Sequence, residues 1–424
     1  MTPTAWVPWT REPATSIACS VGLVNQYGRL VDRRLPTKRR SDARVRARCE
    51  DDENDRSLIE SWWFRERFWE RRASFRLAMQ AARLHEYTED MSEGLQIEDI
   101  NEPQATDPHD VLLDIAGAGW CRTDNHIIEG MWAEYVPQEL PMTLGHENAG
   151  EVIDVGEEVE IVNEGDSVIC HPVQTCGACR PCRLGEDMYC ENSAFNGLTT
   201  DGGFAKYLQT SDRAVIPLSD GVDPVEIAPH ADAGITAYHA VKKAVSELNP
   251  GDHAIVIGIG GLGHIGLQCL RAMSAATITA LDVKDGALSL AEELGAEHTV
   301  NSGSEDVASE IESISDGVGA EQVLDFVGQD ETTTLAGDVV AAGGDHHIIG
   351  YGGHVHEPSQ LLVNGEISFR GNIVGKYTEL QELVALVKRG DVSLRTTRHG
   401  LDDVNTVAER LEHGEIEGRA VITP

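Results

Sequence analysis

Four cysteines stand close together in one short stretch, CGACRPCRLGEDMYC: Cys176, Cys179, Cys182 and Cys190. Their spacing, Cys-x2-Cys-x2-Cys-x7-Cys, suits one tetrahedral ion held by four thiolates, which is the pattern of a closed structural zinc site. Other residue types that bind zinc lie upstream, in the segments GHE at 145–147 and GWCRTD at 119–124. The sequence therefore predicts two zinc ions with different roles.

A catalytic zinc needs three protein ligands and one open position. Outside the four-cysteine stretch, Cys121 and His146 supply the first two. The remaining thiols are poor candidates for the third, because Cys269 falls inside a predicted helix and Cys170 precedes the four-cysteine stretch. Asp232 is our choice, since a carboxylate oxygen is an accepted zinc ligand and Asp232 stands where two domains should meet. The alternative for Asp232 is a helix N-cap.

A glycine-rich turn follows an apolar strand and opens an apolar helix, and its glycines are Gly258, Gly260, Gly261 and Gly263. Such a turn lets backbone amides approach a pyrophosphate at the helix N-terminus. Asp282 lies 19 residues beyond Gly263, at the end of the next predicted strand. Its carboxylate can accept bonds from a ribose diol and would repel a 2′-phosphate, which predicts NAD rather than NADP. A purely structural turn with an incidental aspartate is the alternative.

The charge of the chain is strongly uneven. Its 424 residues are enough for two domains, and they carry 34 Lys+Arg against 71 Asp+Glu, a net charge of −37. Residues 1–78 hold 16 basic and 11 acidic side chains, whereas the rest hold 18 and 60. An acidic surface poor in lysine is typical of adaptation to a salt-rich cytoplasm, because salt screens the repulsion; a generic acidic protein is the alternative. This surface argues against nucleic acid and anionic membranes as partners.

Residues 1–78 form a basic extension with five of the seven tryptophans and no sustained apolar period, so it is assigned no fold. It can be read as a stretch outside the working protein, with Met79 as the natural start, as a basic arm for nucleic acid, or as a targeting peptide. We favour the first, because the extension has neither a recognisable nucleic-acid module nor the apolar core of a secretory signal. The nine cysteines of the chain fit metal ligation in a reducing compartment, so a cytoplasmic location is expected.

Two patterns divide the rest of the chain. Short strand-like runs between turn residues, such as VLLDIAGAG and AGEVIDVG, predict a mostly β domain that carries the cysteines as a lobe. After about Gly234, strands alternate with helices in the βαβ rhythm of a doubly wound parallel sheet, which makes the fold class α/β. We therefore predict a catalytic domain from 79–233 and 374–424, with its zinc lobe at 170–192, and an NAD-binding Rossmann domain at 234–373.

From Met79 onward the chain resembles the zinc-dependent medium-chain alcohol dehydrogenases. The stretch GHENAGEVIDVGEEV is similar to the signature Gly-His-Glu-x2-Gly-x5-Gly-x2-Val of that family, and the four cysteines have the family's spacing. The resemblance implies a GroES-like catalytic domain and makes Cys121 and His146 ligands of a catalytic zinc. Most family members have a second cysteine where this chain has Asp232, although some microbial members use aspartate there.

The resemblance also assigns roles around this metal. Glu147 would be a neighbouring or transient ligand, and Asp124 the carboxylate that orients the site. Thr123 would take the proton of the alcohol and His126 would pass it toward solvent through the cofactor ribose. Arg419 would contact the cofactor pyrophosphate. The plain alternatives are a turn residue for Thr123, an ordinary helix residue for His126 and a solvated surface residue for Arg419.

The leading functional hypothesis is reversible hydride transfer from a zinc-bound alcohol to NAD, which gives an aldehyde or ketone. A rival within the same fold is a polyol or sugar dehydrogenase. Zinc-independent reductases and non-catalytic binding homologues form another class, against which the intact Cys121, Thr123, Asp124, His126 and His146 argue. Binding of nucleic acid rests on the basic extension alone. The expected partners are a small alcohol or carbonyl substrate and, by resemblance, further copies of the chain in a dimer or tetramer.

Overall fold

The computed structural model describes residues 78–136, 138–304 and 306–424. The predicted basic extension therefore lies outside the described residues, apart from Ala78, which begins the first strand. Among the described helices, none is long and apolar enough to cross a membrane.

A largely antiparallel sheet organises the β-rich part of the chain, which comprises strands β1–β10, β17 and β18. Its central strand, β3, is buried along most of its length because its sequence is a nearly continuous apolar run. The order across the sheet is β10-β6-β5-β3-β18-β17, and β9 also pairs with β3. Its strands are β3 (Asp110–Gly119), β5 (Glu147–Val155), β6 (Ser167–Cys170), β9 (Tyr207–Ser211), β10 (Val215–Pro217), β17 (Thr396–Gly400) and β18 (Arg419–Thr423).

Two smaller sheets complete the β-rich part. One has the order β2-β1-β4 and the other pairs β7 with β8. Their strands are β1 (Ala78–Leu84), β2 (Gln96–Asn101), β4 (Met142–Thr143), β7 (Val173–Gln174) and β8 (Ala194–Phe195). The short helices of this part are η1 (Met91–Glu93), α2 (Arg122–Ile128), α3 (Arg180–Arg183), η2 (Asp187–Tyr189), α4 (Pro224–Ile227) and η3 (Ala228–Ala231).

The second part of the chain is built on a six-stranded parallel sheet with the order β13-β12-β11-β14-β15-β16. This is the doubly wound order of dinucleotide-binding domains. Its first strand, HAIVI, is buried at every residue, as a central parallel strand requires. The strands are β11 (His253–Ile257), β12 (Thr277–Asp282), β13 (His298–Asn301), β14 (Ala320–Asp325), β15 (Val340–Ile348) and β16 (Ser368–Gly371).

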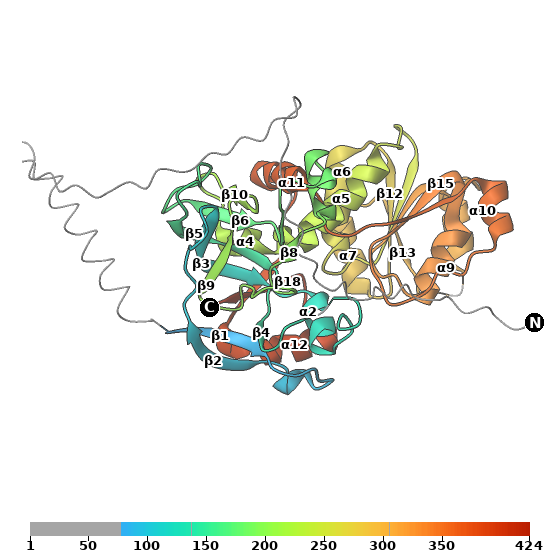
Figure 1. The fold of residues 1–424 in the computed structure, drawn as a ribbon. Coiled ribbons are helices and arrows are strands. Elements are labelled where there is room, and N and C mark those ends of the chain that lie inside the picture. Colours follow the sequence, from blue (N-terminus) through green and yellow to red (C-terminus); the bar gives the residue numbers. More distant parts are fainter. Residues whose placement is uncertain (1–77, 137, 305) are drawn as a thin grey trace, which may run out of the picture. The chain divides into compact units, whose positions relative to one another are not determined.

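Helices precede, connect and follow these parallel strands, and Figure 1 shows α9 and α10 beside β15. The helices are α5 (Ala233–Val245), α6 (Gly263–Met273), α7 (Asp285–Glu293), α8 (Val307–Ile314), α9 (Asp330–Val339), α10 (Ser359–Gly365) and α11 (Tyr377–Arg389). Both α6 and α11 bury one apolar face, which is the pattern of helices that cover a sheet. The α/β fold predicted from the alternating pattern is confirmed.

Helix α5 joins the two parts through a shared core. Ten of its thirteen residues are buried, and its apolar side chains belong to one cluster with Ala149 and Ile169 of the antiparallel sheet and Val256 and Leu267 of the parallel-sheet part. Figure 1 shows α5 and α6 next to each other. This continuous core fixes how the residues of one part meet those of the other.

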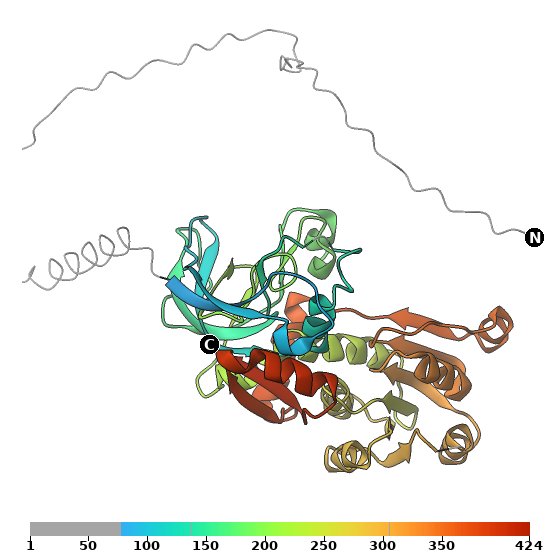
Figure 2. The same cartoon turned by 90° about the horizontal axis from the view of Figure 1, so that it is seen from below.

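The C-terminal segment returns to the β-rich part. Strand β18 pairs antiparallel with β3 and parallel with β17. The segment between them contains η4 (Leu401–Asp403) and α12 (Val404–Glu412), coloured red in Figure 2, and Asn405 Oδ1 accepts a hydrogen bond from Leu95 N at 2.9 Å. Residues near the end of the chain are thereby brought beside residues near the start of the described part.

Candidate active site

One cluster gathers the residues predicted for the catalytic metal: Cys121, His146, Glu147 and Asp232. One potential ligand atom from each lies within 4.8 Å of all the others. Cys121 immediately precedes α2, His146 and Glu147 stand at the start of β5, and Asp232 precedes α5. Three segments far apart in the sequence therefore converge, and Cys121, His146 and Glu147 are buried.

The cluster has the spacing and charge that a zinc ion requires. His146 Nε2 lies 3.4 Å from Asp232 Oδ2, and ligands about 2.0–2.1 Å from zinc at tetrahedral angles stand about 3.4 Å apart. Within the described part of the chain, neither ring nitrogen of His146 has a hydrogen-bond partner. Burial lowers the pKa of His146, but the Asp124 and Asp232 carboxylates outweigh it and hold that pKa well above its ordinary value. Excess negative charge of this kind favours a bound cation, so the residues fit zinc.

Asp232 occupies the position of a helix cap without acting as one. It immediately precedes α5, yet its side chain makes no capping hydrogen bond to the helix. Its carboxylate points instead toward His146. The geometry thus favours ligation over the N-cap alternative.

Asp124 connects Cys121 to His146. Its Oδ2 accepts a hydrogen bond from Cys121 N at 2.9 Å, and its Oδ1 lies 3.2 Å from His146 Nδ1. The first contact arises locally, because Asp124 is the third residue of α2 and its side chain reaches back to the residue before the helix. Asp124 therefore holds the backbone of Cys121 by a hydrogen bond and places a carboxylate charge beside His146.

A buried ion pair joins this cluster to the glycine-rich turn. Arg419 Nη2 donates to Glu147 Oε2 at 2.5 Å, and Glu147 Oε1 accepts from Ala233 N at 3.1 Å. Burial raises the pKa of Glu147 to about 7, while the charges of Arg419 and His146 act in the opposite direction. A Cβ on Gly261 would lie 2.8 Å from Arg419 Nη1. Arg419 is only 4% exposed, so it is not the solvated surface residue of the plain alternative.

The four-cysteine lobe is a second cluster. Cys179 Sγ lies 3.4 Å from Cys182 Sγ and 3.8 Å from Cys190 Sγ, and Cys190 Sγ lies 3.5 Å from Cys176 Sγ. Sulfurs about 2.3 Å from a tetrahedral zinc would stand about 3.8 Å apart. All four thiols are free, and backbone N–H groups of Ala178 and Cys179 lower the pKa of Cys176 to about 6. The thiols therefore fit one zinc ion.

The glycine-rich turn between β11 and α6 has the shape of a pyrophosphate cradle. Gly258 has φ +84°, and a Cβ on Gly263 would lie 1.7 Å from the Gly258 carbonyl oxygen, so both positions require glycine. A Cβ on Gly260 would meet no other atom within 4 Å, which leaves that side of the turn open. Asp282 ends β12, and its Oδ2 accepts from Ile259 N at 2.8 Å, which holds the carboxylate beside the turn.

Thr123 and His126 lie on α2 and share a partner that the sequence analysis missed. Tyr351 Oη lies 3.1 Å from Thr123 Oγ1 and 2.9 Å from His126 Nδ1. Its ring also contacts the Trp132 ring edge to face, with centroids 5.7 Å apart. Tyr351 follows β15 and stands between Gly350 and Gly352. A large aromatic residue between glycines at the carboxyl end of a parallel strand is a sequence pattern that could have identified Tyr351 as a site residue.

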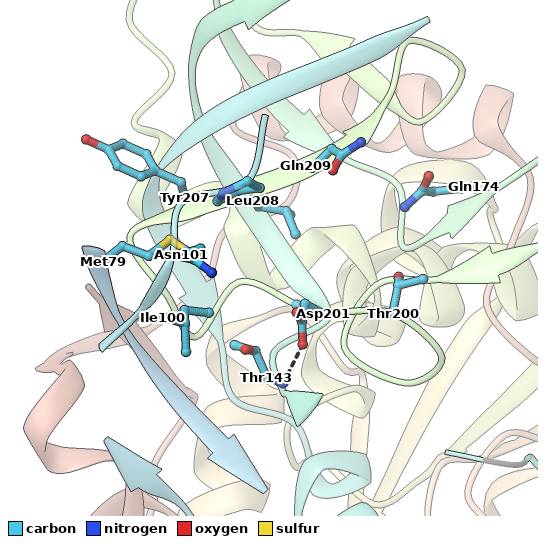
Figure 3. A pocket seen from close by; sticks show the side chains of 12 residues that line it. Met79, Ile100, Asn101, Thr143, Gln174, Thr200, Asp201, Tyr207, Leu208 and Gln209 are labelled. Atoms are coloured by element: carbon cyan, nitrogen blue, oxygen red, sulfur yellow. Dashed lines mark hydrogen bonds between the residues drawn. The ribbon is translucent and has the colours of Figure 1, made fainter. Parts of the chain in front are cut away.

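A separate cavity of about 310 Å³ lies in the β-rich part. Figure 3 shows it between Met79 and Ile100 on one side and Leu208 and Gln209 on the other. At its floor, Asp201 Oδ1 accepts a hydrogen bond from Thr143 N at 2.8 Å. None of the predicted site residues lines this cavity, so it is distinct from the metal cluster.

Comparison with known proteins agrees with the fold and the site. Residues 107–220 match the alcohol dehydrogenase GroES-like domain, and residues 261–389 match the zinc-binding dehydrogenase domain. An NAD-dependent alcohol dehydrogenase of Sulfurisphaera tokodaii is 33% identical over 82% of this chain and 100% of its own length. A D-arabinose 1-dehydrogenase (NADP(+)) of Saccharolobus solfataricus is 35% identical over 78% of this chain and 95% of its own length.

A solved structure, the alcohol dehydrogenase of Aeropyrum pernix, is 47% identical and superposes with a TM-score of 0.78 over 81% of this chain and 100% of that one. The chain belongs to the zinc-dependent medium-chain alcohol dehydrogenase family. It is an oxidoreductase, and the predictions of family and fold class are confirmed.

Proposed function

We propose that this protein is an NAD-dependent zinc alcohol dehydrogenase that interconverts an alcohol and its aldehyde or ketone. The observation that carries the proposal is the convergence of Cys121, His146 and Asp232 within ligand distance of one another, beside Thr123 and His126. The pair of Glu147 and Arg419 extends from this cluster to the glycine-rich turn. This pair supports a cofactor site next to the metal site, as hydride transfer requires.

The two clusters are assigned to two zinc ions. Cys121, His146 and Asp232 supply three ligands and leave a coordination position for substrate, which is the arrangement of a catalytic site. Glu147 lies close enough to serve as a neighbouring or transient ligand. The four thiolates of the lobe leave no open position, which is the arrangement of a structural site.

Bound zinc supplies Lewis acidity toward the alcohol oxygen, and bound NAD supplies the hydride acceptor. Thr123 Oγ1 accepts the hydroxyl proton as the alcohol is oxidised and releases its own proton in the same step. That proton leaves toward solvent through the cofactor ribose and His126. Burial together with the Arg122 charge lowers the pKa of His126, which keeps its ring neutral and able to accept the proton. Tyr351 Oη lies within hydrogen-bond distance of both and holds them in line.

The cofactor is assigned to the parallel-sheet part. The glycine-rich turn receives the pyrophosphate at the N-terminus of α6, and Arg419 adds a positive charge beside Gly261. Asp282 accepts the ribose hydroxyls of NAD. Its negative charge disfavours the 2′-phosphate of NADP.

A sugar or polyol dehydrogenase is the second candidate, because the D-arabinose 1-dehydrogenase is 35% identical to this chain, close to the 33% of the alcohol dehydrogenase of Sulfurisphaera tokodaii. The name of that relative gives NADP(+) as its cofactor, whereas Asp282 at the end of β12 favours NAD. That difference would distinguish the cofactor of this chain from that of the relative, and the substrate panel below distinguishes the two substrate classes.

The organisation of the whole protein is proposed on the same basis. The catalytic domain comprises 79–233 and 374–424 with its zinc lobe at 170–192, and the NAD-binding domain comprises 234–373. The acidic surface supports a salt-rich cytoplasm as the working environment. By family resemblance the protein works as a dimer or tetramer.

The test is reduction of NAD by the full-length protein in high salt, with a panel of primary, secondary and polyhydric alcohols and D-arabinose. Zinc content is measured in parallel. We expect turnover with a simple alcohol and two tightly bound zinc ions per chain, and we expect the Asp232→Ala variant to lose one of them and its activity. The exposed Asp220→Ala is the matched control and should keep both.

Preference for D-arabinose would select the second candidate. Absence of NAD reduction with every substrate would contradict both, and an Asp232→Ala variant with two zinc ions and full turnover would show that the catalytic metal is held differently.

A further inference from the structure

A third group of metal-binding side chains lies outside both clusters described above. Asp330 is the first residue of α9, and His354 and His356 stand in the loop that follows β15. One potential ligand atom from each lies within 4.8 Å of the others, and all three side chains are exposed. The group lies beyond the carboxyl ends of β14 and β15, and neither cofactor binding nor the proposed catalysis uses it.

The separations within this group match those of metal ligands. His354 Nδ1 lies 3.3 Å from Asp330 Oδ1, which is close to the separation of about 3.4 Å for two zinc ligands at tetrahedral angles. The His354 and His356 rings stack with centroids 5.4 Å apart. Both imidazoles therefore face the same side of the loop, toward Asp330.

The backbone holds these residues in place. His354 N donates to Asp330 Oδ1 at 2.6 Å, Thr333 Oγ1 donates to the His354 carbonyl at 2.7 Å, and Gly353 N donates to the Gly328 carbonyl at 2.8 Å. Gly353 permits the close approach, because a Cβ there would lie 2.5 Å from Asp330 N. The loop is thus fixed against the start of α9, and a metal would need only small side-chain rotations.

The Asp330 carboxylate already has one partner, because His354 N donates to its Oδ1 at 2.6 Å. The contact with that N–H would by itself explain an aspartate at this position. It does not explain a second histidine, His356, stacked on the first and within ligand distance of Asp330.

We propose that Asp330, His354 and His356 bind a third zinc ion, with water completing its coordination. Two imidazoles and one carboxylate form a common donor set for this ion. Because the three side chains are exposed and the described residues supply three ligands, this site is weaker than the other two. The bound ion ties the start of α9 to the loop that carries Tyr351, whose hydroxyl contacts Thr123 and His126.

The experiment is equilibrium dialysis of the full-length holoenzyme against increasing concentrations of Zn²⁺ alone. We compare the wild type with the His354→Gln/His356→Gln variant and with His413→Gln, an exposed histidine outside the group. The wild type and the His413 variant should bind one equivalent more than the double variant. Equal uptake by the wild type and the double variant would overturn the proposal.

Asp330→Asn separates a three-ligand site from binding by the two histidines alone. Asparagine keeps an acceptor for the His354 N–H, so the loop should keep its position while the charged ligand is lost. We expect the dissociation constant of the third equivalent to rise by more than about tenfold, measured by the same titration. An unchanged dissociation constant would overturn the assignment of Asp330. Because uptake of zinc is measured rather than turnover, the result stands apart from that of the dehydrogenase assay.

Discussion

The four-cysteine lobe and the cluster of Cys121, His146 and Asp232 solve the same coordination problem in opposite ways. The lobe draws all its ligands from one stretch between Cys176 and Cys190, and three of them are partly or fully exposed. The cluster proposed for the catalytic zinc draws its candidate ligands from three distant segments, and Cys121 and His146 are buried.

The difference lies in what each cluster needs from its surroundings. A closed site of four thiolates satisfies its ion locally and can sit at the surface. An open site needs exclusion of water, an orienting carboxylate and a balance of charge, which here come from burial, Asp124 and the pair of Glu147 and Arg419. Local ligands therefore serve stability, and long-range ligands serve chemistry.

Cys121→Ala should give the largest effect. Loss of several kcal/mol of Lewis-acid stabilisation corresponds to a decrease in kcat/KM of about 1,000-fold. Initial rates of NAD reduction and zinc content would check it, with zinc falling from two ions to one. Cys170→Ala, a buried thiol outside both clusters, is the control. Full activity in the Cys121→Ala variant would contradict the assignment of Cys121 as a ligand of the catalytic zinc.

Glu147→Gln should be the largest single loss of stability. Arg419 would keep its charge in a buried position without a partner, which costs about 3–5 kcal/mol. Urea unfolding measures the change in the free energy of unfolding. The control is Glu226→Gln, because Glu226 is exposed and lies 3.5 Å from Arg398. Loss of this surface ion pair should cost at most about 1 kcal/mol. The double variant Glu147→Gln/Arg419→Met should recover part of the loss. Equal losses of stability in the Glu147→Gln and Glu226→Gln variants would contradict the view that the pair of Glu147 and Arg419 is excluded from water.

Cys179→Ser should separate structure from chemistry at the lobe. When the free zinc concentration is about a hundred times the Kd of the lobe, loss of zinc binding lowers the free energy of unfolding by about 2.7 kcal/mol. Thermal unfolding would show the loss, while turnover per folded molecule should stay close to that of the wild type. A variant that keeps its stability and loses turnover would reverse the roles assigned to the two zinc sites.

Tyr351→Phe should give the smallest effect, confined to the catalytic site. It removes one hydroxyl that positions Thr123 and His126, and a net loss of about 1.4 kcal/mol corresponds to a tenfold decrease in kcat. KM for NAD should change little, and the solvent isotope effect on kcat should rise if proton transfer becomes slower. Tyr135→Phe, 79% exposed, is the control. An unchanged kcat and isotope effect would exclude a positioning role for Tyr351.

The order of strands and helices could be predicted from the sequence because it depends on residues that are close together along the chain. Alternating apolar strands and helices from HAIVI to DHHIIG predicted a parallel sheet, and β11 to β15 form it. The glycine-rich turn and the four cysteines each lie within one short stretch of sequence. Their residue spacing alone therefore indicated a pyrophosphate site for the turn and a zinc site for the cysteines.

The sequence by itself thus determined the parallel sheet, the cysteine lobe and most of the residue types of the catalytic cluster. Only the tertiary structure decided that Asp232 turns toward His146 instead of capping α5, that Arg419 is buried against Glu147, and that Tyr351 meets Thr123 and His126. The physical reason is the same in each case. These contacts join residues between 86 and 272 positions apart in the sequence, and no local periodicity encodes them.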